Sequence, residues 1–454
     1  MIPARKRALF VLCLALAVVV IDNTILAVAF PSIQRGLDTD EAGLQWIGSS
    51  YGLVLAGLLL PLAVIGDRHG RKRMLMIGLT TFGVASVLGA FADSAAALTV
   101  ARGLMGVGGA CAMPATLSTI GNVFPEEERG QAIAVWSGVA GIATAAGPVI
   151  GGLLLAHFWW GSVFLVNVPV VLVTLVLAAW WVPASRDPES PRVDTRSALY
   201  WWGALTAVIL TVIEGPQLGW FSPVVVGSAV IGVLLLVAFT RNEARSDGPL
   251  IDAATRHDPR LLWGAATMSA LFFAVFGAQF VITQWIQGPL GESAMVAGLF
   301  FVPAAVASLV TAIGNPRLVR AYGHGRVAAS GLAATALGAM LAAGAVAAGS
   351  LAVVAVAGLF LGIGIGAASA SGAELIMSSA PPERAGSASG VNETLVEAAG
   401  ALGIAVLGSV LVETGSFGWP LPVAAGVAAL VAIGVVRGLN PRRAARRARV
   451  TPTS

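Results

Sequence analysis

Fourteen apolar windows recur along this 454-residue chain, and short polar segments separate them. A helix of about 20 residues, at about 1.5 Å per residue, crosses the hydrocarbon core of a bilayer. Every backbone polar group in that core must be bonded internally, so each window has to be helical. Glycine, at 55 residues, suits helices that pack closely in lipid. We therefore predict an all-α polytopic membrane protein with spans near residues 8–30, 45–65, 74–92, 96–121, 132–156, 162–182, 198–214, 223–239, 261–286, 295–314, 327–346, 351–376, 387–412 and 420–438.

The lysines and arginines lie almost wholly on one side of these spans. If the N-terminus is cytoplasmic, 25 of the 27 fall in cytoplasmic segments, with Arg35 outside and Arg102 within a span. Positive residues are retained on the cytoplasmic side of membrane proteins. The distribution therefore predicts that both termini are cytoplasmic.

Two polar stretches divide the spans into six, two and six. We expect an N-terminal six-helix bundle over 1–182, a linker with two additional spans over 183–260, a C-terminal six-helix bundle over 261–438 and a basic cytoplasmic tail over 439–454. Six-helix repeats are one plan for secondary transporters, and the substrate site then lies between the repeats near the membrane midplane.

The sequence lacks the residue patterns that ATP binding and metal binding require. Neither of the two lysines, Lys6 and Lys72, lies in a Gly-Lys-Ser/Thr context, so a phosphate-binding loop for ATP is absent. The four histidines have no metal-ligand spacing. The glycine run over 362–366 lies inside a span, where close helix packing is its expected role. We predict no enzymatic activity, cofactor, metal or nucleic-acid partner, which leaves ion-coupled transport.

Asp22 lies in a stretch without another charged residue from Ala8 to Gln34. An ionisable group in the bilayer core costs at least ~2.5 kcal/mol, so it needs a functional or structural reason. Asp22 lies roughly 13 Å below the outer end of its span, and Arg102 about 6–9 Å below the outer end of the fourth span. A pair between them is geometrically possible. Protonation of Asp22 would then break the pair and couple proton binding to helix movement; the alternative is a fixed structural ion pair.

Glu393 and Glu397 are four residues apart and share a face of the thirteenth span. Two carboxylates this close do not both ionise easily, which suits exchange of a proton for a cation. Glu397 lies near the midplane, whereas Glu393 is as consistent with a packing or gating carboxylate. Glu214 and Glu413 are expected to be solvated at outer ends, and Glu374 to lie near the cytoplasm.

Four phenylalanines follow one another along the ninth span. One face of this stripe could line a lipophilic cavity, and a lipid-facing stripe is the equal alternative. The stripe comprises Phe272, Phe273, Phe276 and Phe280.

The segment 66–73, Gly-Asp-Arg-His-Gly-Arg-Lys-Arg, resembles the loop signature between the second and third helices of the major facilitator superfamily. Ala63 stands where that signature usually begins with Gly. The resemblance implies a conformational latch between the two halves on the cytoplasmic side, formed by Asp67, Arg68, Gly70, Arg71 and Lys72.

Further motifs in both halves narrow the resemblance. Residues 102–110 resemble the fourth-helix motif, and 143–152 the fifth-helix motif associated with antiporters, which includes Gly147, Pro148, Gly151 and Gly152. The same glycines would also form a smooth packing face, and Pro148 a kink. Segments 21–31, 164–169 and 392–403 are similar to the fourteen-span drug:proton antiporter branch, and segment 392–403 is most similar to its exporters of quaternary ammonium compounds and cationic dyes.

The resemblance implies a proton-coupled antiporter that exports lipophilic, cationic drugs or dyes by alternating access, in the bacterial cytoplasmic (inner) membrane. Its coupling residues would be Asp22, Glu393, Glu397 and Arg102. Ser49 and Ser308 stand where exporters of dications carry acids, which favours monovalent or neutral substrates. We expect a monomer whose partners are a lipophilic small molecule, protons and the lipid bilayer, without ATP. Open alternatives are a dedicated exporter of one natural product, a proton symporter and a non-transporting membrane scaffold.

Overall fold

The computed structural model describes residues 4–186, 194–245, 258–379 and 385–439, and these residues form helices and no strands. Fourteen helical segments are long and apolar enough to cross a membrane, which confirms the predicted number of spans. Many helices run beyond the apolar windows. Helix α1, for example, continues to Leu37, because polar end turns can lie outside the hydrocarbon core.

The first six spans are built by seven helices. They are α1 (Ala4–Leu37), α2 (Glu41–His69), α3 (Arg71–Ala90), α4 (Ala95–Val123), α5 (Glu126–His157), α6 (Ser162–Leu165) and α7 (Asn167–Trp181), of which α6 and α7 together make the sixth span.

The rest of the chain adds a pair of spans and six more. They are α8 (Thr195–Leu218), α9 (Pro223–Glu243), α10 (Pro259–Gln287), α11 (Ala294–Leu299), α12 (Val302–Tyr322), α13 (His324–Ala348), α14 (Leu351–Gly364), η1 (Ile365–Ser369), α15 (Ala370–Met377), α16 (Ala385–Thr414) and α17 (Pro420–Gly438). The tenth span is α11 with α12, and the twelfth is α14, η1 and α15.

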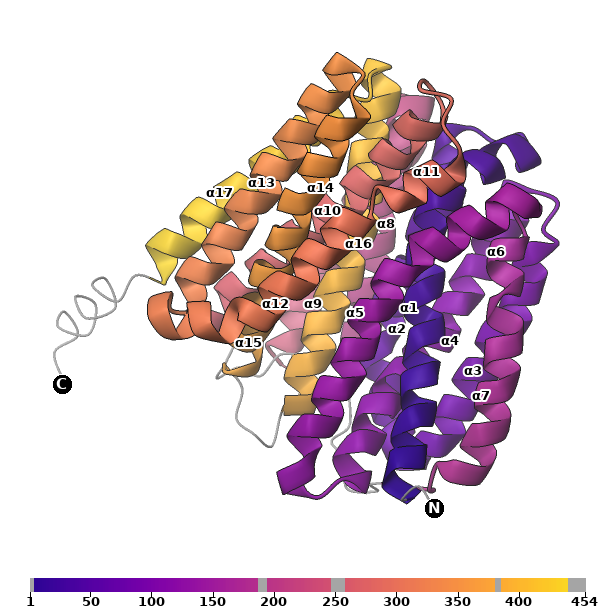
Figure 1. Ribbon diagram of the computed structural model, residues 1–454, viewed down its shortest axis with the longest axis vertical. Coiled ribbons are helices and arrows are strands. Elements are labelled where there is room, and N and C mark those ends of the chain that lie inside the picture. The colour runs from indigo at the N-terminus through magenta and orange to yellow at the C-terminus, as the bar shows by residue number, and fades with distance from the viewer. Residues whose placement is uncertain (1–3, 187–193, 246–257, 380–384, 440–454) are drawn as a thin grey trace, which may run out of the picture.

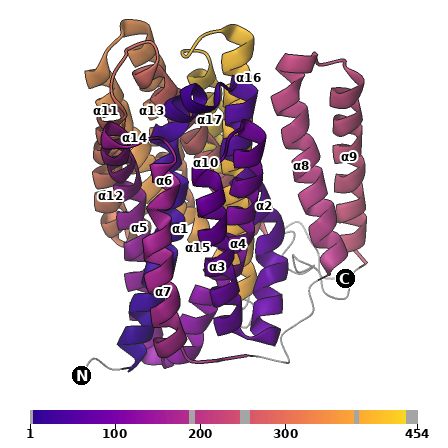
Figure 2. The same ribbon diagram turned by 90° about the vertical axis from the view of Figure 1, so that its right-hand side faces the viewer.

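Figure 1 shows α1 to α7 on one side of the molecule and α10 to α17 on the other. We call the end where α1 begins the basic end, and the end where α1 finishes the distal end. The two groups of helices meet at the distal end, where α11 packs against α5. Toward the basic end α12 diverges from α5 (Figure 1), whereas α2 and α16 stay in contact as far as Leu60 and Gly390. Helices α8 and α9 stand together beside the two groups, and α8 contacts both α2 and α16 (Figure 2).

Glycines set the closest helix contacts in both halves. A methyl group on Gly108 of α4 would lie 2.8 Å from the carbonyl oxygen of Gly78 on α3. A methyl group on Gly277 of α10 would lie 2.6 Å from the carbonyl oxygen of Gly403 on α16. No side chain fits at such distances, so these glycines allow the backbones to touch.

The glycine run at residues 362–366 leads into η1, a single π-helical turn. The amide of Asn315 on α12 donates to the carbonyl oxygens of Gly366 and Ala367, at 3.2 and 3.1 Å. A π-turn disturbs the regular i→i−4 bonding, and Asn315 satisfies carbonyls at this point. Gly362 lies against Ala304 of α12, in agreement with the packing role expected for this run.

Candidate functional site

Asp22 and Arg102 form an ion pair in the interior of the first half. Arg102 Nη1 donates to Asp22 Oδ2 at 2.5 Å, and both side chains are fully buried. The amide of Asn167 on α7 donates to Asp22 Oδ1 at 2.7 Å and lies 3.3 Å from the hydroxyl of Ser86 on α3. Helices α1, α3, α4 and α7 thus converge on one carboxylate, and a charge-assisted bond of this kind is stronger than a neutral one.

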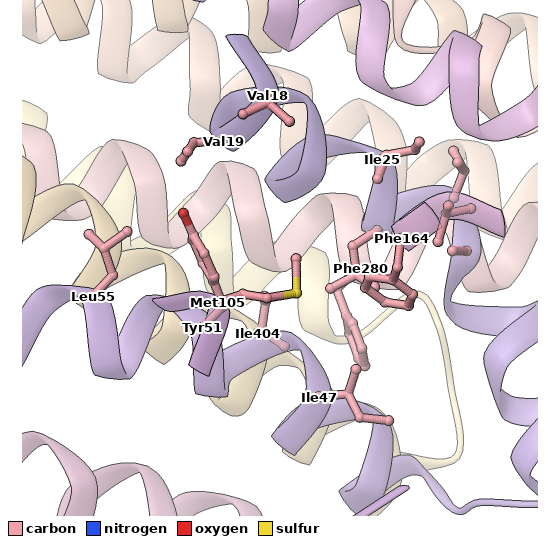
Figure 3. Packing of buried hydrophobic residues seen from close by; sticks show 14 of the residues in the cluster. Val18, Val19, Ile25, Ile47, Tyr51, Leu55, Met105, Phe164, Phe280 and Ile404 are labelled. Carbon is pink, nitrogen blue, oxygen red and sulfur yellow. The ribbon is translucent and has the colours of Figure 1, made fainter. Parts of the chain in front are cut away.

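Tyr51 of α2 covers the other side of the guanidinium. The Arg102 Cζ atom lies 4.6 Å from the centroid of the Tyr51 ring, within the range of a cation–π contact. Gly109 of α4 makes room for this ring, since a methyl group there would lie 2.9 Å from the Tyr51 hydroxyl. In Figure 3 that hydroxyl points toward the part of α1 that carries Val18 and Val19.

Glu397 of α16 reaches the first half at Gly52. A methyl group on Gly52 would lie 3.3 Å from Glu397 Oε2 and 3.1 Å from the Glu397 carbonyl oxygen. Glu397 is 7% exposed, and Glu393, half-buried one turn earlier, interacts with it electrostatically. The carboxylate therefore lies at the contact between α2 and α16, where the two halves meet.

A small pocket, called the cavity below, lies between the two halves, two helical turns along α16 from Glu397. Its wall is mainly apolar, with two amide side chains, Asn23 and Gln279. The lining residues are Asn23, Thr24, Leu26, Ala27 and Phe30 of α1, Gly48 of α2, Phe276, Gln279 and Phe280 of α10, and Ile404 of α16. A mainly apolar lining with a few polar groups has the chemical character of a small-molecule site.

Two residues of the phenylalanine stripe line the cavity, and the other two pack against neighbouring residues. Phe276 and Phe280 line the cavity, so part of the stripe faces it as one of the two interpretations of the sequence requires. Phe273 instead places its backbone against Gly403 of α16. Phe272 packs edge to face on Phe276, with ring centroids 5.6 Å apart.

Helix α5 brings its motif glycines against both halves. Gly147 lies against Thr24, and Gly151 against Ile25 and Val28, all on α1. Gly152 faces the other half, where a methyl group would lie 2.7 Å from the Met295 Cα atom. Pro148 lies inside α5 without ending it, and its carbonyl oxygen faces Gly298 on α11.

The described bonds of the loop expected to latch the halves go to the first half and to the start of the linker, and none of them reaches the second half. Arg71 Nε donates to Asp67 Oδ1 at 2.6 Å, and its backbone N–H donates to the carbonyl oxygen of Ser185. Lys72 donates to the carbonyl oxygen of Ala179 at 2.8 Å. Gly70 has φ +123°, a conformation that favours glycine. Arg68 is half-buried in the same loop.

Polar bonds tie the two halves together at the distal end. Gln287 of α10 donates to the carbonyl oxygen of Val28 on α1 at 2.9 Å. With its amide oriented to donate, Gln284 bonds the Glu41 carboxylate at 3.0 Å, and Gln34 donates to the same carboxylate at 3.1 Å.

Glu413 is exposed at its helix end, as expected, and its carboxylate accepts from the indole of Trp220 at 2.8 Å. Glu214 is half-buried rather than fully solvated, and accepts from the indole of Trp46 at 2.9 Å. Glu374 is exposed near the basic end, at the predicted level. Ser49, where an acid was noted as absent, donates to the backbone of α16.

The structure therefore gathers Asp22, Arg102, Glu397 and Glu393 near the contact of the two halves, whereas the loop at 66–73 lies apart. The positions of Tyr51 and of the cavity amides were not predicted from the sequence. Tyr51 carried a usable signal, because it is one of three tyrosines and lies in mid-span.

Comparison with known proteins gives consistent matches. A family model described as Major Facilitator Superfamily matches residues 12–404. The chain is 34% identical to the multidrug efflux pump LfrA of Mycolicibacterium smegmatis, over 89% of this chain and 80% of that protein. It is 35% identical to the methyl viologen resistance protein SmvA of Salmonella typhimurium, over 91% and 84%.

A third relative and a solved structure extend this comparison. The tetracenomycin C resistance and export protein of Streptomyces glaucescens is 31% identical, over 88% of this chain and 74% of that protein. The crystal structure of the POT family transporter PepTSo has a TM-score of 0.74 at 16% identity, over 97% and 98% of the two chains. At that identity the structural likeness shows the fold alone.

Proposed function

Because the chain belongs to the major facilitator superfamily, we propose that it exports lipophilic drugs in exchange for protons. The family is one of transporters rather than enzymes, and the chain is a multi-pass protein of the bacterial inner membrane. Relatives named as drug efflux and resistance proteins support drugs as the substrate class.

The observation that carries the proposal is the buried Asp22–Arg102 pair, close to a largely apolar cavity between the halves. The two side chains are fully buried, so adding a proton to Asp22 leaves the guanidinium without its counter-charge. An uncompensated buried charge costs about 3–5 kcal/mol, enough to drive rearrangement of the helices around it. Glu397, with Glu393 beside it, is the second protonation site.

In the proposed cycle the two halves, residues 1–182 and 261–438, move relative to each other, and the basic end lies in the cytoplasm. The distal bonds close the outer side in the present state, so the drug enters from the cytoplasm or inner leaflet and reaches the cavity. Asn23, Thr24 and Gln279 are its polar residues, and none of the described lining residues is a carboxylate, which favours neutral or monovalent substrates. The loop at 66–73 would join the halves when the transporter opens outward.

The test uses the purified protein in liposomes with an imposed pH gradient, with a fluorescent dye and a pH indicator recorded together. We expect dye movement and opposite proton movement from the parent, and loss of both from Asp22→Asn and Glu397→Gln. Glu374→Gln, which neutralises an exposed acid, is the matched control and should transport like the parent. If both buried-acid variants transport as well as the parent, the coupling assignment is wrong.

A dedicated exporter of a single natural product is the second candidate, favoured by the relative named for tetracenomycin C. Susceptibility of cells with and without the protein, tested against a panel of unrelated drugs, separates the two. Protection against several chemical classes supports multidrug export, and protection against one class supports the dedicated exporter.

A further inference from the structure

Arg102 uses only part of its hydrogen-bonding capacity. Its Nη1 atom donates to Asp22, whereas Nε and Nη2 are buried without a hydrogen-bond partner among the residues that the structure describes. Buried donors without acceptors are unfavourable, and a guanidinium can serve two carboxylates because its five N–H groups point in different directions. The free donors therefore call for a second acceptor in another state of the protein.

Glu397 is the carboxylate placed to act as this second acceptor for Arg102. It belongs to the other half, is nearly fully buried, and interacts electrostatically with the Arg102 guanidinium. Within the described parts of the chain, however, Arg102 lies at ion-pair distance only from Asp22. Glu397 is thus close enough to be felt by the guanidinium but not bonded to it in the present state.

Tyr51 lies at the junction of these groups. Its ring faces the guanidinium, and its neighbour Gly52 touches Glu397. Its buried hydroxyl has no hydrogen-bond partner in the described structure. An aromatic face stabilises a cation without fixing its direction, so the guanidinium can turn beneath the ring while it changes partner.

The other groups around Arg102 fix the charge of the cluster. Asp22 faces it from α1, Tyr51 from α2 and Glu397 from α16, and Glu393 lies one turn from Glu397 on the same helix. Among the described residues of this cluster, Arg102 is the one cation, so two ionised carboxylates beside it would leave an excess negative charge in a buried site. One ionised carboxylate at a time is the balanced arrangement.

We propose that Arg102 is shared between the halves: it pairs with ionised Asp22 in the present state and with ionised Glu397 once Asp22 carries a proton. The inference rests on the proposed function. In this exchange one proton binds the Asp22 carboxylate and one leaves the Glu397 carboxyl, so the net charge of the buried cluster stays the same. The exchange moves the guanidinium from an acid of its own half to an acid of the opposite half, so proton uptake changes how the halves are joined.

Carbodiimide labelling tests this exchange directly. Dicyclohexylcarbodiimide modifies protonated carboxyl groups in apolar surroundings, and mass spectrometry locates the adduct. In the full-length parent we expect labelling of Glu397, because Asp22 holds Arg102. In Asp22→Asn the guanidinium is free for Glu397, and labelling should fall about tenfold or more, since a nearby cation favours the ionised carboxylate. In Asp22→Asn/Arg102→Gln the cation is gone, and labelling should return.

Equal labelling of Glu397 in the parent and in Asp22→Asn would overturn the proposal, as would an unlabelled Glu397 in the parent. If Asp22→Asn does not give folded protein, Glu397→Gln supplies the reverse test. Arg102 then has no second acid, so labelling of Asp22 should require a lower pH than in the parent. An unchanged pH would overturn the proposal.

The two proposals fail separately. Absence of pH-driven dye movement by the parent would refute proton antiport, whatever the labelling shows. Proton-driven transport with Glu397 labelling unaffected by Asp22→Asn would refute the shared arginine alone.

Discussion

Gly151 is the position where a single methyl group has the best-defined effect. On α5 it lies against α1, and a methyl group there would be 2.6 Å from Val28 Cγ2 and 2.7 Å from Ile25 Cγ1. Carbon atoms pack best at about 3.5–4.0 Å, so the neighbours must retreat by about 1 Å. Both neighbours are β-branched and stiff at χ1, so α1 itself has to move.

The cost follows from two opposing effects. Overpacking a well-packed contact costs about 1–3 kcal/mol. Alanine stabilises a helix relative to glycine by about 0.5–1 kcal/mol. Gly151→Ala should therefore lose up to about 2.5 kcal/mol, whereas Gly141→Ala on the same helix should gain about 0.5–1 kcal/mol. At Gly141 a methyl group would meet nothing within 4 Å.

Thermal unfolding of the purified variants in one detergent measures this difference. For a unit the size of the first half, 1 kcal/mol corresponds to about 2–4 °C, so Gly151→Ala should unfold several degrees below Gly141→Ala. Equal unfolding temperatures would refute the close approach of α5 to α1. Because α1 carries Asp22, we also expect slower pH-driven transport from Gly151→Ala.

Three further changes test other contacts. Tyr51→Leu removes the ring beside Arg102 and should cost about 2 kcal/mol in thermal unfolding, whereas Tyr51→Phe keeps the ring and should stay near the parent; identical losses would exclude the ring contact. Phe276→Ala should lower the apparent affinity for aromatic dyes by up to about tenfold, measured by competition in efflux assays. An unchanged apparent affinity would place the substrate elsewhere. Trp46→Phe removes the indole N–H that Glu214 accepts and should cost about 1.5–3 kcal/mol, visible as a lower unfolding temperature; no change would show that this bond does not hold α8.

The number of spans was predictable because a bilayer allows few solutions. An apolar window of sufficient length has to be a helix, so hydropathy alone locates all fourteen spans. The breaks in regular helix within a span were not predictable. The π-turn at η1 depends on Asn315 of another span, which lies close enough to bond its carbonyls. No local pattern in the glycine run distinguishes it from a regular packing helix.

The approach of Asp22 and Arg102 was foreseeable for a related reason. The rise of a helix converts sequence position into depth, and two buried opposite charges at similar depth favour each other. Depth does not determine which helices are neighbours. Tyr51, Asn167 and Gln279 owe their positions to the lateral packing of helices, which no single span encodes.

The two additional spans bear on the movement of the halves. Helix α8 bonds α2 through Glu214 and Trp46, and its Val212 carbonyl accepts from Ser409 of α16 at 2.6 Å. These bonds lie near the distal end, so α8 holds one helix from each half there. A transporter that opens its distal end has to break or carry these contacts, while the buried acids change partners near the middle of the same α2–α16 contact. Helix α8 therefore stabilises the present state, and proton exchange at Glu397 acts against it.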